Sequence, residues 1–410
     1  MRILLTANAS YVPPRGGATR SNLLWLEYMA AEGHACRVVA AALAESTGKS
    51  AQMAQEGSDR QKLVERGVEV YEVAEHARQR AALRRQIREF QPDWVLVSSE
   101  DLGHGLLREA HGSAPGRVVY LAHTPQFFPF GPASWNPDAG AAELVARAAA
   151  VVAIGGHTAA YIRRHTGREA VVIHPPIYGG GPFPNLASFD AGLITMVNPC
   201  AVKGISIFMA LAERFPEYGF GVLPGWGTTA ADRAQMAAHA NIATLPNCRH
   251  IAEFLSRTRI LLMPSLWHEG FGLTVMEAML HGIPVISSDA GGLVEAKMGT
   301  PFVAPAPAIE RYAPVFDEYS LPQPVTGPVD LRPWEEALRA LLTDRALYER
   351  VSIASREAAL SFALSLDAGR MPEFLQSLKP GEAVRERSSQ ANLSPERRNL
   401  LLQMARGRKH

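Results

Sequence analysis

Short apolar segments alternate along this chain with longer segments whose apolar positions recur every three or four residues. Short apolar runs are typical of buried parallel strands, and the longer periodic segments are typical of the helices that connect them. The first half predicts helices that include 19–32 and 77–90, and strands at 3–7, 36–41, 69–73, 94–98, 118–122, 151–154 and 170–173. The second half predicts further helices between strands at 193–197, 219–223, 242–245, 260–264 and 284–287.

A glycine- and proline-rich segment interrupts this alternation near the middle of the chain. Residues 178–191 include three consecutive glycines, which is typical of a linker between domains. The two flanking series predict an α/β fold with two Rossmann-like, doubly wound domains, residues 1–183 and 184–355, facing a central cleft. Residues 305–330 are proline-rich and predict no definite element, whereas a helical stretch is expected from about 333 to 378.

Composition and charge exclude some classes of protein. The formal net charge is +1, so no global charge favours a nucleic acid or an anionic membrane surface as partner. The three cysteines, Cys36, Cys200 and Cys248, match no metal or redox spacing and are expected to be buried thiols in a reducing compartment. The chain opens on a predicted strand and not on a secretion signal, and no apolar run reaches the roughly 20 residues of a membrane span. We therefore expect a cytoplasmic protein without a transmembrane segment.

The most informative stretch is 261–295, LLMPSLWHEGFGLTVMEAMLHGIPVISSDAGGLVE, which predicts a strand, a loop, a helix and a further strand. Gly270 and Gly272 let the loop backbone approach a ligand closely, and the N–H groups at the helix start can bind anionic oxygens. Glu269 on the loop and Glu277 on the helix offer carboxylates beside this anion site. The pattern predicts a diphosphate site that needs no metal, with acceptors for the hydroxyl groups of a sugar and a ribose.

This segment resembles the E-x7-E signature of the retaining glycosyltransferases of family 4, the glycogen-synthase-like and mannosyltransferase clan, which have the GT-B fold. The match includes Pro-Ser, Glu-Gly-Phe-Gly, Glu-Ala-Met, Gly-x-Pro-Val and a later Gly-Gly followed by Glu. The resemblance implies that Glu269 contacts the transferred sugar and that Glu277 holds the ribose hydroxyls of a nucleoside diphosphate sugar. It also implies a crossover helix at 356–380 that returns to the first domain. Further donor contacts are implied for Gly270, Phe271, Gly272 and Leu273.

A second part of the implied donor site follows the linker. Met196-Val-Asn-Pro-Cys-Ala-Val-Lys203-Gly204 stands where the family usually has Gly-Arg-Leu-x-x-x-Lys-Gly. Lys203 would neutralise charge on the leaving diphosphate, or it is a solvated lysine at a strand end. Asn198 replaces the usual Arg and removes a bidentate phosphate donor, which leaves more of that role to Lys203.

The first domain offers candidates at two strand ends. Gly16 and Gly17 precede a helix where the family carries a Gly-Gly close to donor phosphate and acceptor, although many strand-to-helix turns contain glycine. Arg15 is a phosphate or acceptor contact or a surface charge. The resemblance places His123, after the strand 118–122, opposite the donor sugar and near the reacting carbon. The alternative for His123 is a polar residue that only satisfies its own hydrogen bonds.

Aromatic residues gather just after His123, at 126–135. They form an apolar acceptor platform that includes Phe127 and Phe128, or they fill the hinge region between the domains. No Asp-x-Asp pair occurs in the chain, which agrees with metal-independent chemistry and no cofactor beyond the nucleoside diphosphate sugar as co-substrate. No convincing nucleophile–base pair for a double displacement is evident either.

The last residues, 381–410, are polar and basic. Ser394 and Pro395 fit the start of a short helix whose apolar stripe would be Leu400, Leu401 and Met404. This tail is similar to L-S-P-x-x-R-x-L-L-L segments beside carrier and condensation domains of nonribosomal peptide synthetases. One hypothesis is docking of residues 388–410 on such a nonribosomal peptide or polyketide assembly-line protein, and the alternative is a frayed end.

Together these features predict a retaining, metal-independent glycosyltransferase that moves a hexose from a nucleoside diphosphate sugar to an acceptor hydroxyl, in natural-product or glycoconjugate biosynthesis. Rival predictions are a nucleotide-sugar epimerase or a sugar phosphorylase on the same fold, or a catalytically idle homologue that serves as a nucleotide-sugar-binding scaffold. The sequence leaves the base, the sugar, the acceptor and the oligomeric state open.

Overall fold

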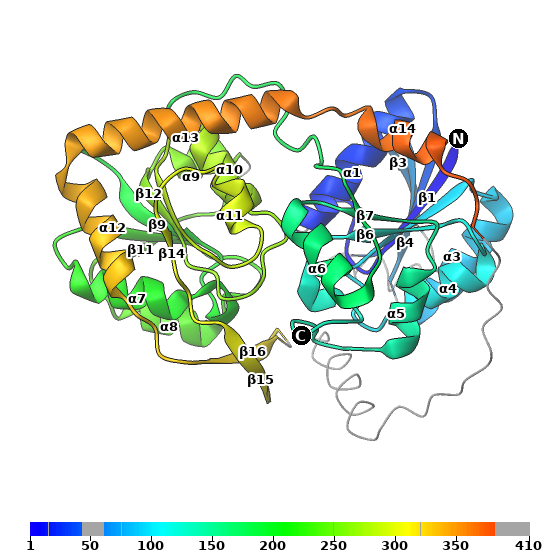
Figure 1. Cartoon of the computed structure of the whole chain (residues 1–410), viewed down its shortest axis with the longest axis horizontal. Coiled ribbons are helices and arrows are strands. Elements are labelled where there is room, and N and C mark those ends of the chain that lie inside the picture. The colour runs from blue at the N-terminus through cyan, green and yellow to red at the C-terminus, as the bar shows by residue number, and fades with distance from the viewer. Residues whose placement is uncertain (15, 43–60, 75, 249, 320, 382–410) are drawn as a thin grey trace. The chain divides into compact units, whose positions relative to one another are not determined.

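The computed structural model describes residues 1–14, 16–42, 61–74, 76–248, 250–319 and 321–381, which form two compact units (Figure 1). Unit 1 comprises Met1–Gly179 and the segment that begins at Leu366, and unit 2 comprises Gly180–Ser365. Arg15 and the tail predicted at 388–410 lie outside the described residues.

Unit 1 is built on a sheet that has eight strands in the described part of the chain, in the order β3-β4-β2-β1-β5-β6-β7-β8. All neighbouring strands are parallel except β3, which pairs antiparallel with β4 at the edge. The strands are β1 (Arg2–Ala7), β2 (Ala35–Ala41), β3 (Gln61–Glu65), β4 (Val68–Val73), β5 (Trp94–Ser98), β6 (Val118–Ala122), β7 (Ala150–Ala153) and β8 (Val171–Val172). The helices are α1 (Gly16–Ala31), α3 (His76–Phe90), α4 (Gly105–Ser113), the 3-10 turn η2 (Pro125–Phe127), α5 (Ala139–Ala146), α6 (Gly156–Thr166) and α14 (Arg370–Ser377).

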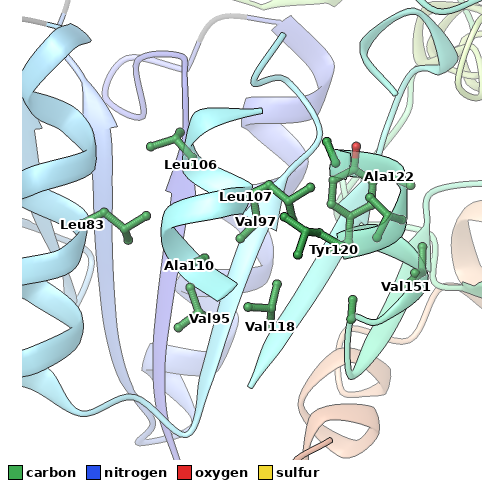
Figure 2. Close-up of a cluster of buried hydrophobic side chains, with 14 of the residues drawn as sticks. Leu83, Val95, Val97, Leu106, Leu107, Ala110, Val118, Tyr120, Ala122 and Val151 are labelled. Atoms are coloured by element: carbon green, nitrogen blue, oxygen red, sulfur yellow. The ribbon is translucent and has the colours of Figure 1, made fainter. Parts of the chain in front are cut away.

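A hydrophobic core of unit 1 lies between the sheet and helices α3, α4, α5 and α6. Strands β5 and β6 are buried along their whole length, as expected for parallel strands with both faces covered. Figure 2 shows Val95 and Val97 of β5 facing Leu106, Leu107 and Ala110 of α4, with residues of α3, β6 and β7 around them. This packing fixes the carboxyl ends of β1, β5 and β6 relative to one another.

Unit 2 repeats the doubly wound plan, with a parallel sheet in the order β11-β10-β9-β12-β13-β14 over the described residues. Its strands are β9 (Leu193–Val197), β10 (Phe220–Leu223), β11 (Ile242–Thr244), β12 (Thr258–Met263), β13 (Val285–Ser288) and β14 (Val303–Ala304). Its helices are η3 (Ala201–Lys203), α7 (Ile205–Arg214), α8 (Ala230–Ala237), α9 (Ile251–Leu255), α10 (Leu273–Leu280), α11 (Leu293–Ala296), α12 (Arg332–Thr343) and α13 (Arg345–Ser365). The predicted strands of both halves and the two-domain α/β class are confirmed.

Two stretches differ from the expected pattern. The proline-rich stretch contains a separate antiparallel ribbon of β15 (Ile309–Phe316) and β16 (Pro322–Thr326). The helical stretch expected from 333 to 378 consists of three helices, of which α12 and α13 belong to unit 2 and α14 to unit 1. The C-terminal helical segment thus returns to the first unit. Within the described residues, no helix combines the length and apolarity that crossing a membrane requires.

Candidate functional site

The candidate site in unit 2 lies where the sheet reverses its winding direction. The chain runs outward from β9 to β10 and β11, then returns to β12 on the other side of β9. Loops that leave two such neighbouring strands at their carboxyl ends open a crevice, which is the usual ligand site of doubly wound sheets. Asn198 and Lys203 follow β9, and Ser265 and Glu269 follow β12.

A buried ion pair joins the two loops. Lys203 Nζ donates to Glu269 Oε1 at 2.5 Å, and Ser265 Oγ donates to the same oxygen at 2.6 Å. Both bonds are to Oε1, so Glu269 Oε2 carries none within the described part of the chain. The ammonium of Lys203 also lies 4.3 Å from the centre of the Trp267 ring, and this contact stabilises the cation. A buried lysine and a buried carboxylate are therefore held together, with hydrogen-bonding capacity to spare on both.

The backbone explains why these two side chains meet. The N–H groups of Leu266 and Trp267 donate to Val202 O at 3.0 and 3.2 Å, so the loop after β12 is bonded to the 3-10 turn that carries Lys203. Gly204 has a φ of +80°, and a Cβ at this position would overlap the carbonyl oxygen of Pro264. Glycine after Lys203 is thus required both by the backbone angle and by the close approach of the β12 loop.

The Gly291-Gly292 pair fixes the Glu269 loop from the other side. Gly291 forms a parallel β-bridge with Glu269, and the Gly292 N–H donates to Glu269 O at 2.7 Å. A Cβ on Gly291 would lie 2.5 Å from Glu269 N, and a Cβ on Gly292 would lie 2.6 Å from Gly270 O. Gly291 and Gly292 therefore allow their own backbone to lie close to the backbone of the Glu269 loop, and this contact sets the position of Glu269.

Helix α10 begins directly after this loop. Gly272 is its N-cap residue with a φ of +114° and gives no side-chain cap, so the first N–H groups of the helix have no partner from the cap. Leu273 at the first helical position and Glu277 in the second turn are both half-buried. Phe271 is buried and stacks on Phe362 of α13, with ring centroids 5.4 Å apart. An uncapped helix N-terminus beside the Lys203–Glu269 pair is a favourable place for an anion.

Asn198, where the resemblance leads us to expect an arginine, has a defined structural role. Its φ is +53°, a left-handed backbone that asparagine adopts more readily than most residues. Its Oδ1 accepts the N–H of Gly227 at 2.9 Å, so the side chain holds the loop after β10. Asn198 Nδ2 is buried and has no hydrogen-bond partner among the described residues. Both N–H groups of the Asn198 amide are thus left for ligand oxygens, where the arginine that the resemblance implies would offer five donors.

In unit 1, Gly16 and Gly17 are exposed at the start of α1, and Gly16 has a φ of +86°. The helix begins there, earlier than the expected residue 19. Arg15 precedes it and lies outside the described residues. The N-terminus of α1 therefore presents backbone N–H groups at the place that the sequence predicts for the Gly-Gly contact, whose role stays a prediction.

His123 lies at the end of β6 and is completely buried. Its Nε2 is 3.0 Å from Asn22 Oδ1, and Asn22 Nδ2 donates to Ser98 Oγ at 3.2 Å. Because Asn22 presents its oxygen, Nε2 carries the ring proton, and Nδ1 is an acceptor. Burial lowers the pKa of His123 to about 3, so the ring is neutral at physiological pH. Nδ1 has no partner within the described residues, which makes it an acceptor for a ligand hydroxyl.

The aromatic loop after His123 divides into core and surface. Phe128 is completely buried, and its ring lies 5.4 to 6.2 Å from those of Phe130, Tyr161 and Tyr120. Phe128 is therefore a core residue of unit 1 and cannot form an acceptor platform, which corrects that expectation. Phe127 is half-buried and packs edge-on against Trp135 at 5.4 Å, so its expected acceptor role stays open.

Several site residues were not predicted from the sequence. Ser265 was noticed only as part of a Pro-Ser match, and its hydroxyl binds Glu269. Asn22 lies on α1, far in sequence from the His123 that it orients. The exposed Trp226, in the loop that Asn198 holds, lies 5.6 Å from the Trp267 ring. The contacts of Asn22 and Trp226 depend on tertiary structure, which no local motif reports, whereas Ser265 lies only four residues before Glu269.

Comparisons with known proteins agree with this architecture. Residues 15–178 match the family described as Glycosyltransferase Family 4, and residues 221–313 match the family described as Glycosyl transferases group 1. A 93-residue stretch is 29% identical to an uncharacterized 42.6 kDa protein of the cps region of Klebsiella pneumoniae and covers 23% of this chain. That match spans a quarter of the Klebsiella protein's length.

Solved structures with the same fold cover nearly the whole chain. Anabaena Alr3699/HepE in complex with UDP and glucose has a TM-score of 0.63 at 17% identity, over 92% of this chain and 100% of that one. An Escherichia coli protein described as trehalose-6-phosphate, bound with UDP-2-fluoro glucose, has a TM-score of 0.61 at 13% identity, over 93% and 100%. A glycosyltransferase from Rickettsia africae has a TM-score of 0.60 at 13% identity, over 92% and 97%. This chain therefore carries glycosyltransferase domains in both units, on the GT-B fold of two Rossmann-like domains.

Proposed function

We propose that this protein is a retaining, metal-independent glycosyltransferase that moves a hexose from a nucleoside diphosphate sugar to an acceptor hydroxyl. The observation that carries the proposal is the buried Lys203–Glu269–Ser265 cluster beside the uncapped N-terminus of α10. The comparisons support the donor class, because HepE was solved with UDP-glucose and the Escherichia coli protein with a fluorinated UDP-glucose.

The proposed donor site matches the chemistry of a diphosphate. Its oxygens are anionic acceptors, and unit 2 offers donors from Lys203 Nζ, Asn198 Nδ2 and the first N–H groups of α10. Glu269 Oε2 would accept a hydroxyl of the transferred sugar, and Glu277 would accept the ribose hydroxyls. No cofactor is proposed beyond the donor itself.

In the proposed step, the bond between the anomeric carbon and the diphosphate oxygen breaks while the acceptor oxygen bonds to that carbon on the same face. The proton of the acceptor hydroxyl passes to an oxygen of the leaving diphosphate. Lys203 would stabilise the charge that develops on this leaving group, and preorganised groups of this kind supply a large part of catalysis. The Lys203–Glu269 pair holds the ammonium in place before the donor binds, so little reorganisation is needed.

The first test is a thermal-shift and calorimetric screen of UDP, GDP, ADP and TDP and their common sugar conjugates, with and without EDTA. A ligand at a hundred times its Kd should add about 2.7 kcal/mol to the free energy of unfolding. We expect one base to stabilise the protein regardless of EDTA, and Glu277→Ala to weaken that effect. The matched control is Glu357→Ala, which changes an exposed carboxylate of α13 in the same unit. No stabilisation by any nucleotide would contradict the donor site.

A second candidate is a catalytically idle homologue that binds nucleotide-sugar as a scaffold. It is favoured by Asn198, because Oδ1 is occupied by the β10 loop and a single amide replaces an arginine. Turnover separates the two: a scaffold binds the donor but releases no nucleoside diphosphate with any acceptor. Docking of residues 388–410 on an assembly-line protein is a separate proposal. Unchanged activity on a carrier-bound acceptor after deletion of this tail would contradict it.

A further inference from the structure

The loop after β10 carries an exposed aromatic ring that the proposed chemistry does not use. All six tryptophans of the chain lie within the described residues, and only Trp226 is exposed, at 48%. Its ring lies 5.6 Å from the ring of Trp267, and the ammonium of Lys203 lies 4.3 Å from the centre of that second ring. The Trp267 ring thus connects the exposed indole with the cation of the candidate donor site.

The two glycines that flank Trp226 hold this loop against the loop after β9. The N–H of Gly227 donates to Asn198 Oδ1 at 2.9 Å. A Cβ on Gly225 would lie 2.7 Å from the same oxygen. A Cβ on Gly227 would lie 2.9 Å from Cys200 Sγ. Neither glycine has room for a side chain, so the backbone on both sides of Trp226 is fixed while the indole itself stays exposed.

The ribbon of β15 and β16, which lies outside the main sheet of unit 2 (Figure 1), also contacts this loop. Leu321, just before β16, would lie 3.3 Å from a Cβ on Gly227. Glu318 Oε1 accepts the N–H of Ala230 at 2.7 Å, where the loop enters α8. The loop therefore has little conformational freedom to lose when a ligand binds, which preorganises Trp226 as a stacking surface.

The chemistry of an indole face selects one part of the proposed donor. A nucleobase is planar and aromatic, and bases stack on aromatic side chains whatever their hydrogen-bonding edges. A diphosphate is anionic, and the face of an aromatic ring is negative, so the phosphates are not attracted to it. The transferred sugar is rich in hydroxyl groups, and Glu269, its proposed acceptor, follows β12 on the other side of β9 from the Trp226 loop. The base is therefore the part that fits Trp226.

We propose that Trp226 stacks on the nucleobase of the donor and thereby distinguishes a nucleoside diphosphate from other diphosphates. This inference rests on the proposed transfer from a nucleoside diphosphate sugar and adds the residue that binds the base. Asn198 connects the two parts of the site, because its Oδ1 holds the Trp226 loop and its Nδ2 is left for a phosphate oxygen.

The test is isothermal titration calorimetry of the full chain with UDP, GDP, ADP, TDP and inorganic pyrophosphate. We expect Trp226→Ala to weaken binding of the preferred nucleoside diphosphate by about 5- to 150-fold, the usual range for one base on one aromatic ring. Pyrophosphate has the same charged group without a base, so it should bind the variant and the wild type equally. Trp226→Phe keeps a smaller ring and should restore most of the lost affinity. The nucleoside diphosphate should also quench the tryptophan fluorescence of the wild type more than that of Trp226→Phe.

Ile353→Ala is the matched control, because Ile353 is another exposed apolar side chain of unit 2, 57% exposed on α13. It should leave every affinity unchanged. The inference is overturned if Trp226→Ala binds the nucleoside diphosphate as the wild type does, if it loses pyrophosphate affinity to the same extent, or if Trp226→Phe binds no better than Trp226→Ala. A loss confined to the nucleotide sugar would assign the ring to the sugar and would also overturn it.

The same titrations separate this inference from the proposed function. A wild type that binds neither pyrophosphate nor any nucleotide would contradict the donor site itself, and the stacking role would fail with it. Nucleotide binding that is equal in the wild type and in Trp226→Ala would refute the stacking role and leave the donor site intact.

Discussion

Substituting alanine for Gly292 should displace the Glu269 loop without straining the backbone of residue 292. Gly292 has a φ of −72°, which alanine adopts freely, so the effect is steric. The new Cβ would lie 2.6 Å from both Gly270 O and Phe271 Cα, and such carbons essentially never come closer than 3.0 Å. Both neighbours are backbone atoms, so the loop must move by about 0.4 Å to reach this limit and by about 0.8 Å to reach ordinary van der Waals contact. Overpacking of this kind costs about 1–3 kcal/mol of stability.

The functional loss should exceed what the stability loss explains. A misplacement of about 1 Å can reduce a rate by about 100-fold, so a displacement of about 0.5 Å should lower kcat/KM by about tenfold. We would measure release of the nucleoside diphosphate from the donor that the nucleotide screen identifies, below the melting temperature of the variant. Gly327→Ala is the control, because its nearest neighbour would be 3.6 Å from the new Cβ. A Gly292→Ala enzyme with kcat/KM within twofold of the wild type would refute the view that this glycine positions Glu269.

Three further predictions concern stability and are measured by urea denaturation. Glu269→Gln leaves the buried Lys203 without its charge partner and should lower the free energy of unfolding by about 3–5 kcal/mol. Adding Lys203→Met to this variant should recover part of that loss. If the effects of the two substitutions are additive, the two side chains are not coupled. Burial lowers the pKa of Lys297 to about 7, so between pH 7 and 10.5 the unfolded chain binds more protons and stability rises with pH. Lys297→Met should remove this pH dependence, so its stability relative to the wild type should be higher at pH 7 than at pH 10. If variant and wild type show the same dependence of stability on pH, Lys297 is not a neutral buried lysine. Thr229→Ala removes a capping box at α8 and should cost about 1 kcal/mol, and an unchanged midpoint would show that the cap contributes little.

Much of the fold could be predicted from the sequence because parallel strands buried on both faces appear as continuous apolar runs. The edge strand β3 carries charged and exposed residues, with Val64 63% exposed, so it has no such signal. The ribbon of β15 and β16 was missed because its prolines suggest a loop, and its pairing has register shifts that break the alternation. A two-stranded ribbon outside the main sheet tolerates both features.

The part of the candidate site that depends on local sequence motifs could be predicted. The placement of Glu269 on the loop and Glu277 on α10 followed from a strand, a pair of glycines and a helix in close succession. The bond from Lys203 to Glu269 could not be predicted, because it joins two loops that are 66 residues apart in the sequence. Phe128 shows the opposite error, since an aromatic next to a site residue was interpreted as surface and proves to fill the core.

The carboxyl-terminal edges of the two sheets differ in whether they present hydrogen-bond donors or acceptors, and this difference favours different ligands at the two edges. After β9 and at α10, unit 2 presents donors, with Lys203 Nζ and Asn198 Nδ2 beside an uncapped helix start. After β6, unit 1 presents an acceptor, the Nδ1 of His123, which has no partner among the described residues. A diphosphate needs hydrogen-bond donors, whereas the unprotonated Nδ1 of His123 binds only a group that donates, so a diphosphate is not well served at the His123 edge. The main sheets of both units share one plan of strand order, so the residues that follow the strands at the reversal point decide the hydrogen-bonding polarity. Binding of inorganic pyrophosphate at the His123 edge in preference to the Lys203–Glu269 edge would contradict this argument.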